Sequence, residues 1–365
     1  MDVQGSCTDN FFPIKDLFKK YLEEVDEGAG FSVVKNNKIL INIFGKSKNL
    51  KEDWDNNTLV NTFSLSKGIY CGCLLKLIDQ NEINLDKEIS FYWKNFGKSN
   101  KKNITVKHVL SHQSGVHRFK TKLKSEDLLD WEKIITLIES QEPDHEPGKF
   151  NFYHAKTHGY IICNIIKLIT GLDIEDYLHK EVIRDKKLNF HFKNNDSRNC
   201  YDLIYSQQKT QIQEDNLTAF NNPPHDLNFF NSAKFRKAII PSLGGHGSSL
   251  SVAKFFDFLA NDLKYDTNNI IKKETLDKLI QITNNEIDNN LKMKVKWTNC
   301  GLILRGGWMF GKNKESFGHN GWGGSLGFAD PKEGMGVSFI SRKINPSMGS
   351  DPRGVNLIKK LYELL

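Results

Sequence analysis

The sequence has no long hydrophobic run, and no stretch approaches the roughly 18 consecutive apolar residues that a membrane-spanning helix needs. We therefore expect no membrane-inserted segment. The N-terminus also lacks a positively charged segment followed by an apolar one, which is the pattern of a secretory leader. This absence predicts a cytoplasmic protein.

Cysteine is sparse and scattered along the chain. The closest pair, Cys71 and Cys73, lies in an apolar helical stretch, which suits neither a zinc knuckle nor a disulfide framework. We expect the cysteines to be small buried hydrophobic side chains. They are Cys7, Cys71, Cys73, Cys163, Cys200 and Cys300.

The sequence also has no long block of one charge sign. Its 51 Lys and Arg are interleaved with 44 Asp and Glu, which leaves a net charge of +7. The longest cationic stretch, Lys98–Lys102, lies among polar residues, and we expect it to be a solvated loop. Nucleic-acid binding is therefore not expected.

Strand-like and helical patterns are present at both ends of the chain. Apolar residues recur with helical spacing from Ile14 to Val25. Asn36–Asn37, which tolerates the positive φ of a hairpin turn, follows between two strand-like runs. A last helix is expected to begin at Pro352, with Asp351 as its N-cap. The strand-like runs are Phe31–Val34, Ile39–Phe44, Asn299–Leu304, Trp308–Phe310, Leu326–Asp330 and Gly336–Ser341.

The middle of the sequence is helical and poor in strands. The expected helices include Gly68–Gln80, Thr105–Ser111, Trp131–Ser140, His158–Thr170 and Ser251–Leu263. We predict an α/β fold of the α+β type, with an antiparallel sheet flanked by N- and C-terminal helices and an inserted all-α subdomain. All 365 residues would form a single domain, with the α/β part at approximately 1–66 and 265–365 and the helical part at approximately 67–264.

Ser64 and Lys67 are the first candidates for chemistry. Strand-like residues precede Ser64 and an apolar helix follows it, so Lys67 would lie one turn further along the same helix face. A desolvated lysine can take the proton of a serine hydroxyl, and the N–H groups at a helix start favour negative charge. The same Ser-x-x-Lys spacing occurs at Ser99, Ser206 and Ser251, which we interpret as two polar loops and a helix N-cap.

Ser325 is a competing nucleophile, because Gly323–Gly327 matches the G-x-S-x-G pattern of α/β-hydrolases. That elbow requires a helix after the serine, whereas a strand-like run follows Ser325. Its context therefore argues against it.

Two pairs of histidines have the i, i+4 spacing of zinc ligands, His108/His112 and His154/His158. Neither pair has the H-E-x-x-H glutamate, and no third ligand is identifiable. We interpret them as structural histidines and expect no metal site.

Several segments, taken in order, resemble the serine β-lactamase and penicillin-binding-protein superfamily. The resemblance is to its class C-like branch, and most closely to family VIII carboxylesterases and other β-lactamase-related serine hydrolases. It implies a β-lactamase/transpeptidase-like fold. The segments that carry it are Thr62–Lys67 (TFSLSK), Leu85–Asp86, Tyr92–Trp93, Ile104–Gly115, Glu146–Gly148, Phe152–Ala155, Gly318–Ser325, Phe328–Pro331 and Gly349–Arg353.

The resemblance assigns a role to each motif residue. Ser64 would be the nucleophile, Lys67 its general base and Tyr153 the proton shuttle. The backbone N–H groups of Ser64 and Trp322 would form the oxyanion hole. The third motif, His319, Asn320, Gly321 and Trp322, would bind substrate.

Two departures from the β-lactamase pattern bear on the substrate. Ala155 stands where class C enzymes have an asparagine, and His319 stands where β-lactamases have a lysine. A neutral imidazole in place of a fixed cation favours neutral esters over carboxylate-bearing β-lactams.

We therefore expect a serine esterase that acts on small-molecule esters without a cofactor, with its oligomeric state left open. Two alternatives remain: a β-lactamase or D-amino-acid-specific peptidase, and a non-catalytic sensor or scaffold of the same fold.

Overall fold

The computed structural model describes residues 2–24, 28–48, 50–51, 53–183, 188–195, 199–205, 218–261, 264–265, 268–269, 271–345 and 351–365. Within these ranges, no helix combines the length and the apolar character needed to cross a membrane.

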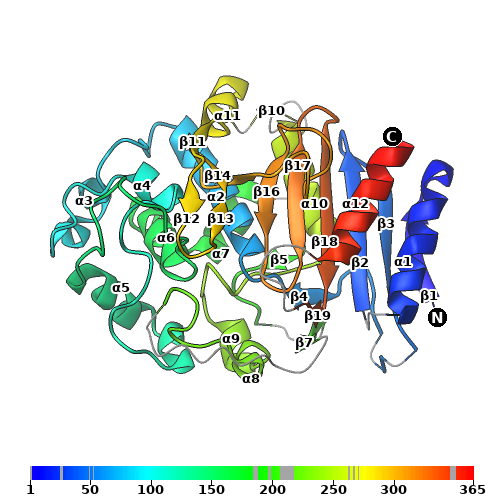
Figure 1. Cartoon of the computed structure of the whole chain (residues 1–365), viewed down its shortest axis with the longest axis horizontal. Helices are drawn as coiled ribbons and strands as arrows, with labels where there is room; N and C mark the ends of the chain where they lie inside the picture. Colours follow the sequence, from blue (N-terminus) through cyan, green and yellow to red (C-terminus); the bar gives the residue numbers. More distant parts are fainter. Residues whose placement is uncertain are drawn as a thin grey trace.

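Nine strands of the described chain form one antiparallel sheet, and they come from both ends of the sequence (Figure 1). They are β1 (Asp2–Cys7), β2 (Gly28–Lys35), β3 (Lys38–Lys46), β11 (Ile282–Asn284), β14 (Lys296–Thr298), β15 (Ile303–Leu304), β16 (Phe317–Asn320), β17 (Leu326–Asp330) and β18 (Met335–Ser341). Their order is β1-β3-β2-β18-β17-β16-β15-β14-β11, so the N-terminal and C-terminal strands join where β2 pairs with β18. The β2–β3 hairpin turns at Asn36 and Asn37, whose φ angles of 49° and 65° are left-handed as expected.

Helices cover the sheet and fill the middle of the chain. The α-helices are α1 (Phe12–Glu24), α2 (Leu65–Asp79), α3 (Ile89–Tyr92), α4 (Val106–Leu110), α5 (Trp131–Ser140), α6 (Thr157–Thr170), α7 (Ile174–Tyr177), α8 (Leu227–Phe230), α9 (Ala233–Lys237), α10 (Ser249–Ala260), α11 (Lys273–Leu279) and α12 (Pro352–Leu364). Three short 3-10 turns, η1 (Asp9–Phe11), η2 (Lys94–Gly97) and η3 (Ser125–Leu129), and the π-helix η4 (Leu178–Ile183) complete the helical elements of the described residues.

The remaining described strands are short. Four form a small sheet of order β5-β8-β4-β6. These are β4 (Leu59–Asn61), β5 (Phe190–His191), β6 (Cys200–Tyr201) and β8 (His246–Gly247), and the other pairs are β7 (Ile204–Tyr205) with β19 (Lys343–Ile344), β9 (Lys264–Tyr265) with β10 (Asn268–Asn269), and β12 (Ile287–Asp288) with β13 (Met293–Lys294).

The large sheet lies between the two terminal helices and α10. Val33 of β2 belongs to the same apolar core as Phe18 of α1 and Leu357 of α12. The next residue toward the chain start, Ser32, faces the other way, and its Oγ lies 2.9 Å from Oγ of Ser249 on α10. The central strands are therefore buried on both faces, which agrees with the burial of every residue of β18.

The predicted fold class is confirmed in its main features. Both ends of the chain contribute strands to one antiparallel sheet, the terminal helices α1 and α12 pack on each other, and the helical middle extends from the sheet (Figure 1). Asp351 caps α12 through the backbone N–H of Arg353, as its sequence predicts. The proposed residue boundaries between an α/β part and a helical part stay a prediction.

The prediction of a strand at Trp308–Phe310 is wrong. The chain makes a tight turn there, in which the N–H of Phe310 donates to the carbonyl of Arg305 and the N–H of Gly307 donates to that of Gly311. Gly307 and Gly311 have φ angles of 83° and 77°, so glycine chemistry overrides the strand propensity of the aromatic residues.

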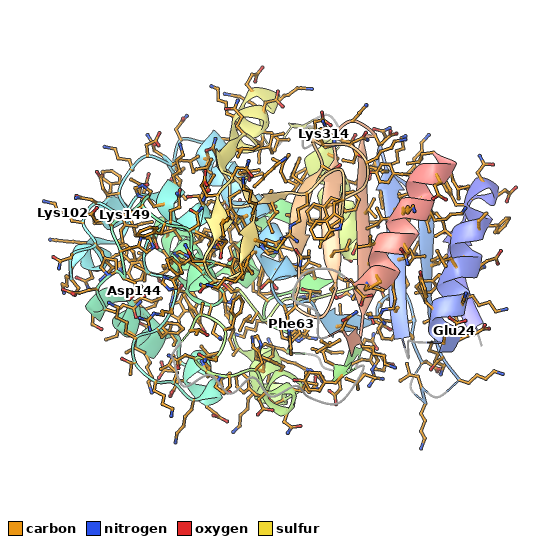
Figure 2. The ribbon with its side chains drawn as sticks, in the orientation of Figure 1. Glu24, Phe63, Lys102, Asp144, Lys149 and Lys314 are labelled. Carbon is orange, nitrogen blue, oxygen red and sulfur yellow. The ribbon has the colours of Figure 1, made fainter. Side chains whose placement is uncertain are left out.

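Two interpretations of polar segments also need correction. Lys102 points outward at one end of the molecule as expected (Figure 2), but Lys101 is fully buried and donates to the carbonyl oxygens of Lys98, Glu139 and Gln141. Ser251 is not the N-cap of α10. That residue is Ser248, whose side chain accepts from the N–H of Ser251.

Five of the cysteines are buried as expected, whereas Cys7 on β1 is partly exposed. The sequence of β1 is polar and did not predict a strand. This segment becomes a strand at the edge of the sheet because its backbone pairs with β3.

Candidate active site

Ser64 lies where β4 passes into α2, at the junction of the large sheet and the helical part. Its neighbours Phe63 and Leu65 are buried, while Ser64 itself is partly exposed. Phe63, labelled in Figure 2, has a φ of 46°, and its N–H donates to Oδ1 of Asn61 at 2.7 Å. A left-handed conformation is costly for a bulky residue, so the chain holds local strain immediately before Ser64.

Lys67 is buried one turn further along α2, and its ammonium nitrogen has three acceptors. Nζ lies 3.2 Å from Oγ of Ser64, 3.0 Å from the carbonyl oxygen of Ala155 and 3.4 Å from that of Ser242. No carboxylate of the described chain pairs with it. Burial, with a smaller contribution from Lys156, lowers the pKa of Lys67 well below its ordinary value.

A neutral amine has two N–H bonds and one lone pair. In Lys67 the carbonyl groups of Ala155 and Ser242 can each accept one N–H, which leaves the lone pair directed at Oγ of Ser64. The geometry is therefore that of a base facing a hydroxyl.

Tyr153 lies close to both Ser64 and Lys67. Nζ of Lys67 is 5.0 Å from the centre of its ring. Burial raises the pKa of its hydroxyl above the usual value, and a hydrogen bond with Ser64 acts in the opposite direction. The backbone N–H of Tyr153 donates to Oδ1 of the buried Asp288 at 3.1 Å, which fixes the tyrosine in place.

The third motif reaches Ser64 from strand β16 and the turn after it. A Cβ atom on Gly321 would lie 2.1 Å from the carbonyl oxygen of Thr62, and one on Gly68 would lie 3.2 Å from Cβ of His319. Glycine at both positions therefore allows β16 to approach the backbone around the serine closely. Trp322 follows directly, and its ring packs edge-on against Phe63 with centroids 5.2 Å apart.

The backbone N–H groups of Ser64 and Trp322 donate no hydrogen bond within the described residues. The N–H of Gly321, in contrast, donates to the carbonyl of Ser325. Two free donors beside a partly exposed hydroxyl can stabilise an oxyanion that forms between them.

Ser64 lines a pocket. Its empty volume, which includes the part open to solvent, is about 560 Å³. The predicted residues Ser64, Tyr153, His319, Asn320 and Trp322 all line it, and Lys67 lies beneath Ser64. Most of the other lining side chains are apolar or aromatic. They include Ala155, Phe220, Leu243, Leu291, Trp297 and Ile303.

Arg305 also lines the pocket, and sequence reasoning missed it. Its guanidinium donates to Oδ1 of Asn320 at 3.3 Å and lies over the ring of Trp308, but no carboxylate in the described part of the chain pairs with it. Burial lowers its pKa to about 10, so it remains a cation at neutral pH. The expectation of a pocket with little fixed positive charge therefore needs correction. His319 itself is neutral, because burial and the nearby Lys67 lower its pKa well below the usual value.

His225 is a second pocket residue that sequence reasoning missed. Its ring lies 4.6 Å from that of Trp322. No local signal marked either residue, because Arg305 follows a strand and His225 lies in an irregular segment far from the motifs in sequence.

The rival serines do not share this setting. Ser325 is buried in the turn before β17, so a strand rather than a helix follows it. Ser99 lies in a turn and donates to the carbonyl of Ser140. Ser206 lies outside the described residues.

The four histidines of the two pairs make hydrogen bonds within the fold. His108 accepts from the N–H of Thr105 in a capping box. His112 Nδ1 accepts from the N–H of His154, and His158 Nδ1 shares a hydrogen bond with the hydroxyl of Tyr70. Nε2 of His112 and Nε2 of His158 have no hydrogen-bond partner among the described residues, so the absence of a metal at these pairs stays a prediction.

A family model described as Beta-lactamase matches residues 14–359 of the chain. Among curated proteins, the chain is 24% identical over 320 residues to the Esterase/beta-lactamase LipL of Mycobacterium tuberculosis, which covers 82% of this chain and 73% of that protein.

Three solved structures superpose on the whole chain. A family VIII carboxylesterase is 26% identical with a TM-score of 0.92, and the match covers 100% of both chains. A penicillin-binding protein homolog from Caulobacter crescentus is 24% identical with a TM-score of 0.91 over 100% of both chains. EstA from Arthrobacter nitroguajacolicus is 22% identical with a TM-score of 0.87, over 100% of this chain and 98% of that one. The last two likenesses concern the fold.

Proposed function

The chain belongs to the Beta-lactamase family, whose model spans residues 14–359, and from this premise we propose that it cleaves carboxylic esters through an acyl-enzyme on Ser64. The contact between Lys67 and Ser64 carries the proposal. A buried lysine with a lowered pKa, 3.2 Å from a partly exposed serine hydroxyl, is a nucleophile–base pair.

In the acylation step, Oγ of Ser64 forms a bond to the ester carbonyl carbon while its proton moves to the lone pair of Lys67. The carbonyl oxygen becomes an oxyanion between the N–H groups of Ser64 and Trp322. When the intermediate collapses, the bond between the carbonyl carbon and the leaving alkoxide breaks. The hydroxyl of Tyr153 donates its proton to the alkoxide oxygen. Tyr153 then recovers a proton from Lys67, so charges balance over the step.

Hydrolysis of the acyl-enzyme uses the same groups with water as the nucleophile. Water adds to the acyl carbonyl while one of its protons moves to the lone pair of Lys67, and when the bond to Ser64 breaks this proton passes to Oγ as the carboxylic acid leaves. Burial lowers the pKa of Lys67 and raises that of Tyr153, so the lysine is more readily neutral and the tyrosine keeps its proton. These states suit a base and an acid that act in the same site.

Three observations favour an uncharged ester as the substrate. Ala155 offers no side-chain amide to the pocket, His319 is neutral, and the lining is mostly apolar. The similarity to a family VIII carboxylesterase, at 26% identity over the full length of both chains, points the same way.

Arg305 supports a second candidate substrate class. A buried cation without a carboxylate partner among the described residues can pair with the carboxylate of a β-lactam or of a peptide that ends in a D-amino acid. We therefore propose β-lactam or D-peptide hydrolysis as the alternative activity of the same site.

A substrate panel tests both candidates. The initial rates with a series of p-nitrophenyl esters of increasing acyl length are compared with those of nitrocefin and a D-alanyl peptide. Faster turnover of the esters supports an esterase, and faster turnover of nitrocefin supports the alternative. A fluorophosphonate probe that labels neither Ser64 nor any other residue would contradict a serine hydrolase and favour a non-catalytic scaffold.

A further inference from the structure

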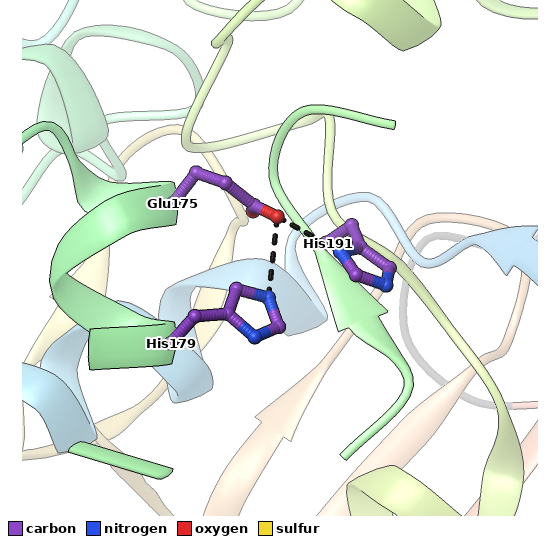
Figure 3. Close-up of side chains that lie close together, drawn as sticks. All are labelled: Glu175, His179 and His191. Atoms are coloured by element: carbon purple, nitrogen blue, oxygen red, sulfur yellow. Dashed lines mark hydrogen bonds and ion pairs between the residues drawn. The ribbon is translucent and has the colours of Figure 1, made fainter. Parts of the chain in front are cut away.

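A second cluster of chemistry-bearing side chains lies where α7 and η4 meet β5. Glu175 lies on α7, His179 follows on η4, and His191 lies on β5 (Figure 3). One ligand atom from each residue lies within 4.8 Å of the other two. None of the three residues lines the pocket of Ser64, so the cluster is separate from the proposed active site.

The spacing of these atoms matches a zinc site. Oε1 of Glu175 lies 2.8 Å from Nδ1 of His191 and 3.2 Å from Nε2 of His179. The carbonyl oxygen of Phe190 lies 3.0 Å from the same nitrogen of His179. Ligands of tetrahedral zinc, at Zn–N distances near 2.1 Å, are about 3.4 Å apart, so the side chains would move apart by a few tenths of an ångström to seat an ion.

The tautomer of His191 is set by its surroundings. Nδ2 of Asn189 donates to the carbonyl of Asn57 at 2.8 Å, which turns Oδ1 of Asn189 toward Nε2 of His191 at 3.2 Å. Nε2 therefore carries a hydrogen, and a neutral His191 presents the lone pair of Nδ1 to Glu175. A lone pair facing a carboxylate oxygen requires a positive charge between them, either a second proton or a metal ion.

His179 faces the same carboxylate, because its Nε2 lies near two acceptors, Oε1 of Glu175 and the carbonyl of Phe190, which a hydrogen or a metal ion on that nitrogen can satisfy. The carboxylate is itself held in place, since its Oε2 accepts from the backbone N–H groups of Phe192 and Lys193 at 2.6 and 3.3 Å. Fixed orientation of a ligand by outer hydrogen bonds is the usual arrangement around protein-bound zinc.

We propose that Glu175, His179 and His191 bind one Zn²⁺ ion, with the carbonyl oxygen of Phe190 or a water molecule as the fourth ligand. Two imidazole nitrogens and one carboxylate oxygen suit zinc, whereas Mg²⁺ and Ca²⁺ prefer oxygen ligands throughout. The ion replaces the protons between the carboxylate and the two rings, and these protons pass to solvent.

The ion joins the helical element η4 to strand β5, so its role is to stabilise the fold. β5 pairs with β8, and β8 pairs with β4, which leads into Ser64. Because binding to the folded state alone raises its stability, zinc is expected to raise the melting temperature.

Direct titration tests the proposal without using hydrolase activity. The protein is stripped with EDTA, dialysed, and titrated with ZnCl₂ alone in a calorimeter, with MgCl₂ as the comparison. We expect one zinc ion per chain, no heat from magnesium, and a rise in Tm of a few degrees. Cobalt chloride is expected to give the intense visible absorption of tetrahedral Co²⁺.

Variants locate the binding. His191→Ala and Glu175→Gln are expected to weaken zinc binding about 100-fold, and Asn189→Ala, which removes the acceptor behind His191, about 10-fold. His145→Ala is the matched control, because its Nδ1 contacts the carbonyl of Glu146 and it lies outside the cluster. Circular dichroism of each stripped variant checks that it is folded.

Two results would overturn the proposal. If the wild-type protein takes up no zinc, protons alone hold the cluster together. If zinc binds the wild-type protein, His191→Ala and Glu175→Gln with equal affinity, the ion is adventitious and lies elsewhere.

Discussion

The carbonyl oxygen of Ala155 accepts a hydrogen bond from Nζ of Lys67 at 3.0 Å. A residue with no functional side chain thus orients the proposed base through its backbone. This contact, together with the one to Ser242, leaves the lone pair of a neutral Lys67 no partner other than Ser64.

Ser64→Ala is expected to abolish ester turnover and covalent labelling by a fluorophosphonate, because it removes the nucleophile. The Tm is expected to change little, since the hydroxyl is partly exposed. Ser325→Ala is the control and is expected to stay active. An active Ser64→Ala beside an inactive Ser325→Ala would reverse the two roles.

Lys67→Ala is expected to lower kcat/KM by about 10²-fold or more, the usual size of a general-base contribution. Lys67→Arg is not expected to restore the rate, because a guanidinium stays protonated. In the wild-type protein kcat/KM is expected to rise with pH through the lowered pKa of Lys67 and then level off. The same rising limb in Lys67→Ala would mean that another group is the base.

Tyr153→Phe keeps the ring and removes the hydroxyl that we assign to protonating the leaving group. The rate loss is expected to be large, about 10²-fold or more, for an alkyl ester and smaller for a p-nitrophenyl ester. The reason is that p-nitrophenoxide leaves readily without a proton. Equal losses with both esters, measured as kcat, would argue against a role for Tyr153 in leaving-group protonation.

Arg305→Met is expected to lower kcat/KM for nitrocefin, which carries a carboxylate, by about 10-fold, because a hydrogen bond to a charged group contributes about 1.5–3 kcal/mol. The value for p-nitrophenyl butyrate is expected to change much less. The ratio of the two constants is the measurement. An unchanged ratio would mean that Arg305 recognises no anionic group.

Lys156 gives a prediction about stability. Its Nζ donates to the carbonyls of Ala219 and Phe220, and burial lowers its pKa to about 7, below the value of about 10.4 in an unfolded chain. Between these values the unfolded chain binds more protons, so this residue makes stability rise with pH, by at most about 1.4 kcal/mol per pH unit. Urea unfolding from pH 7 to 9 is expected to show a flatter profile for Lys156→Met, and parallel profiles would contradict the lowered pKa.

Local patterns in the sequence predicted the elements that border the site. The left-handed Asn36–Asn37 turn, the N-cap Asp351 and the helix after Ser64 each depend on a few consecutive residues. Such features follow from backbone conformation and short-range periodicity, which a sequence displays directly. The proximity of Lys67 to Ser64 belongs to the same class, because one helical turn separates them.

Contacts between distant segments were decided by the tertiary structure. Lys67 meets carbonyl groups 88 and 175 residues away, and no local pattern encodes that encounter. Arg305 enters the pocket because β15 pairs with β16, and Lys101 is buried because three carbonyl oxygens converge on it. The cluster of Glu175, His179 and His191 likewise depends on strand β5 folding back against α7 and η4. Burial and charge pairing are properties of the packed chain, since desolvation depends on what surrounds a group in space and not on its neighbours in sequence.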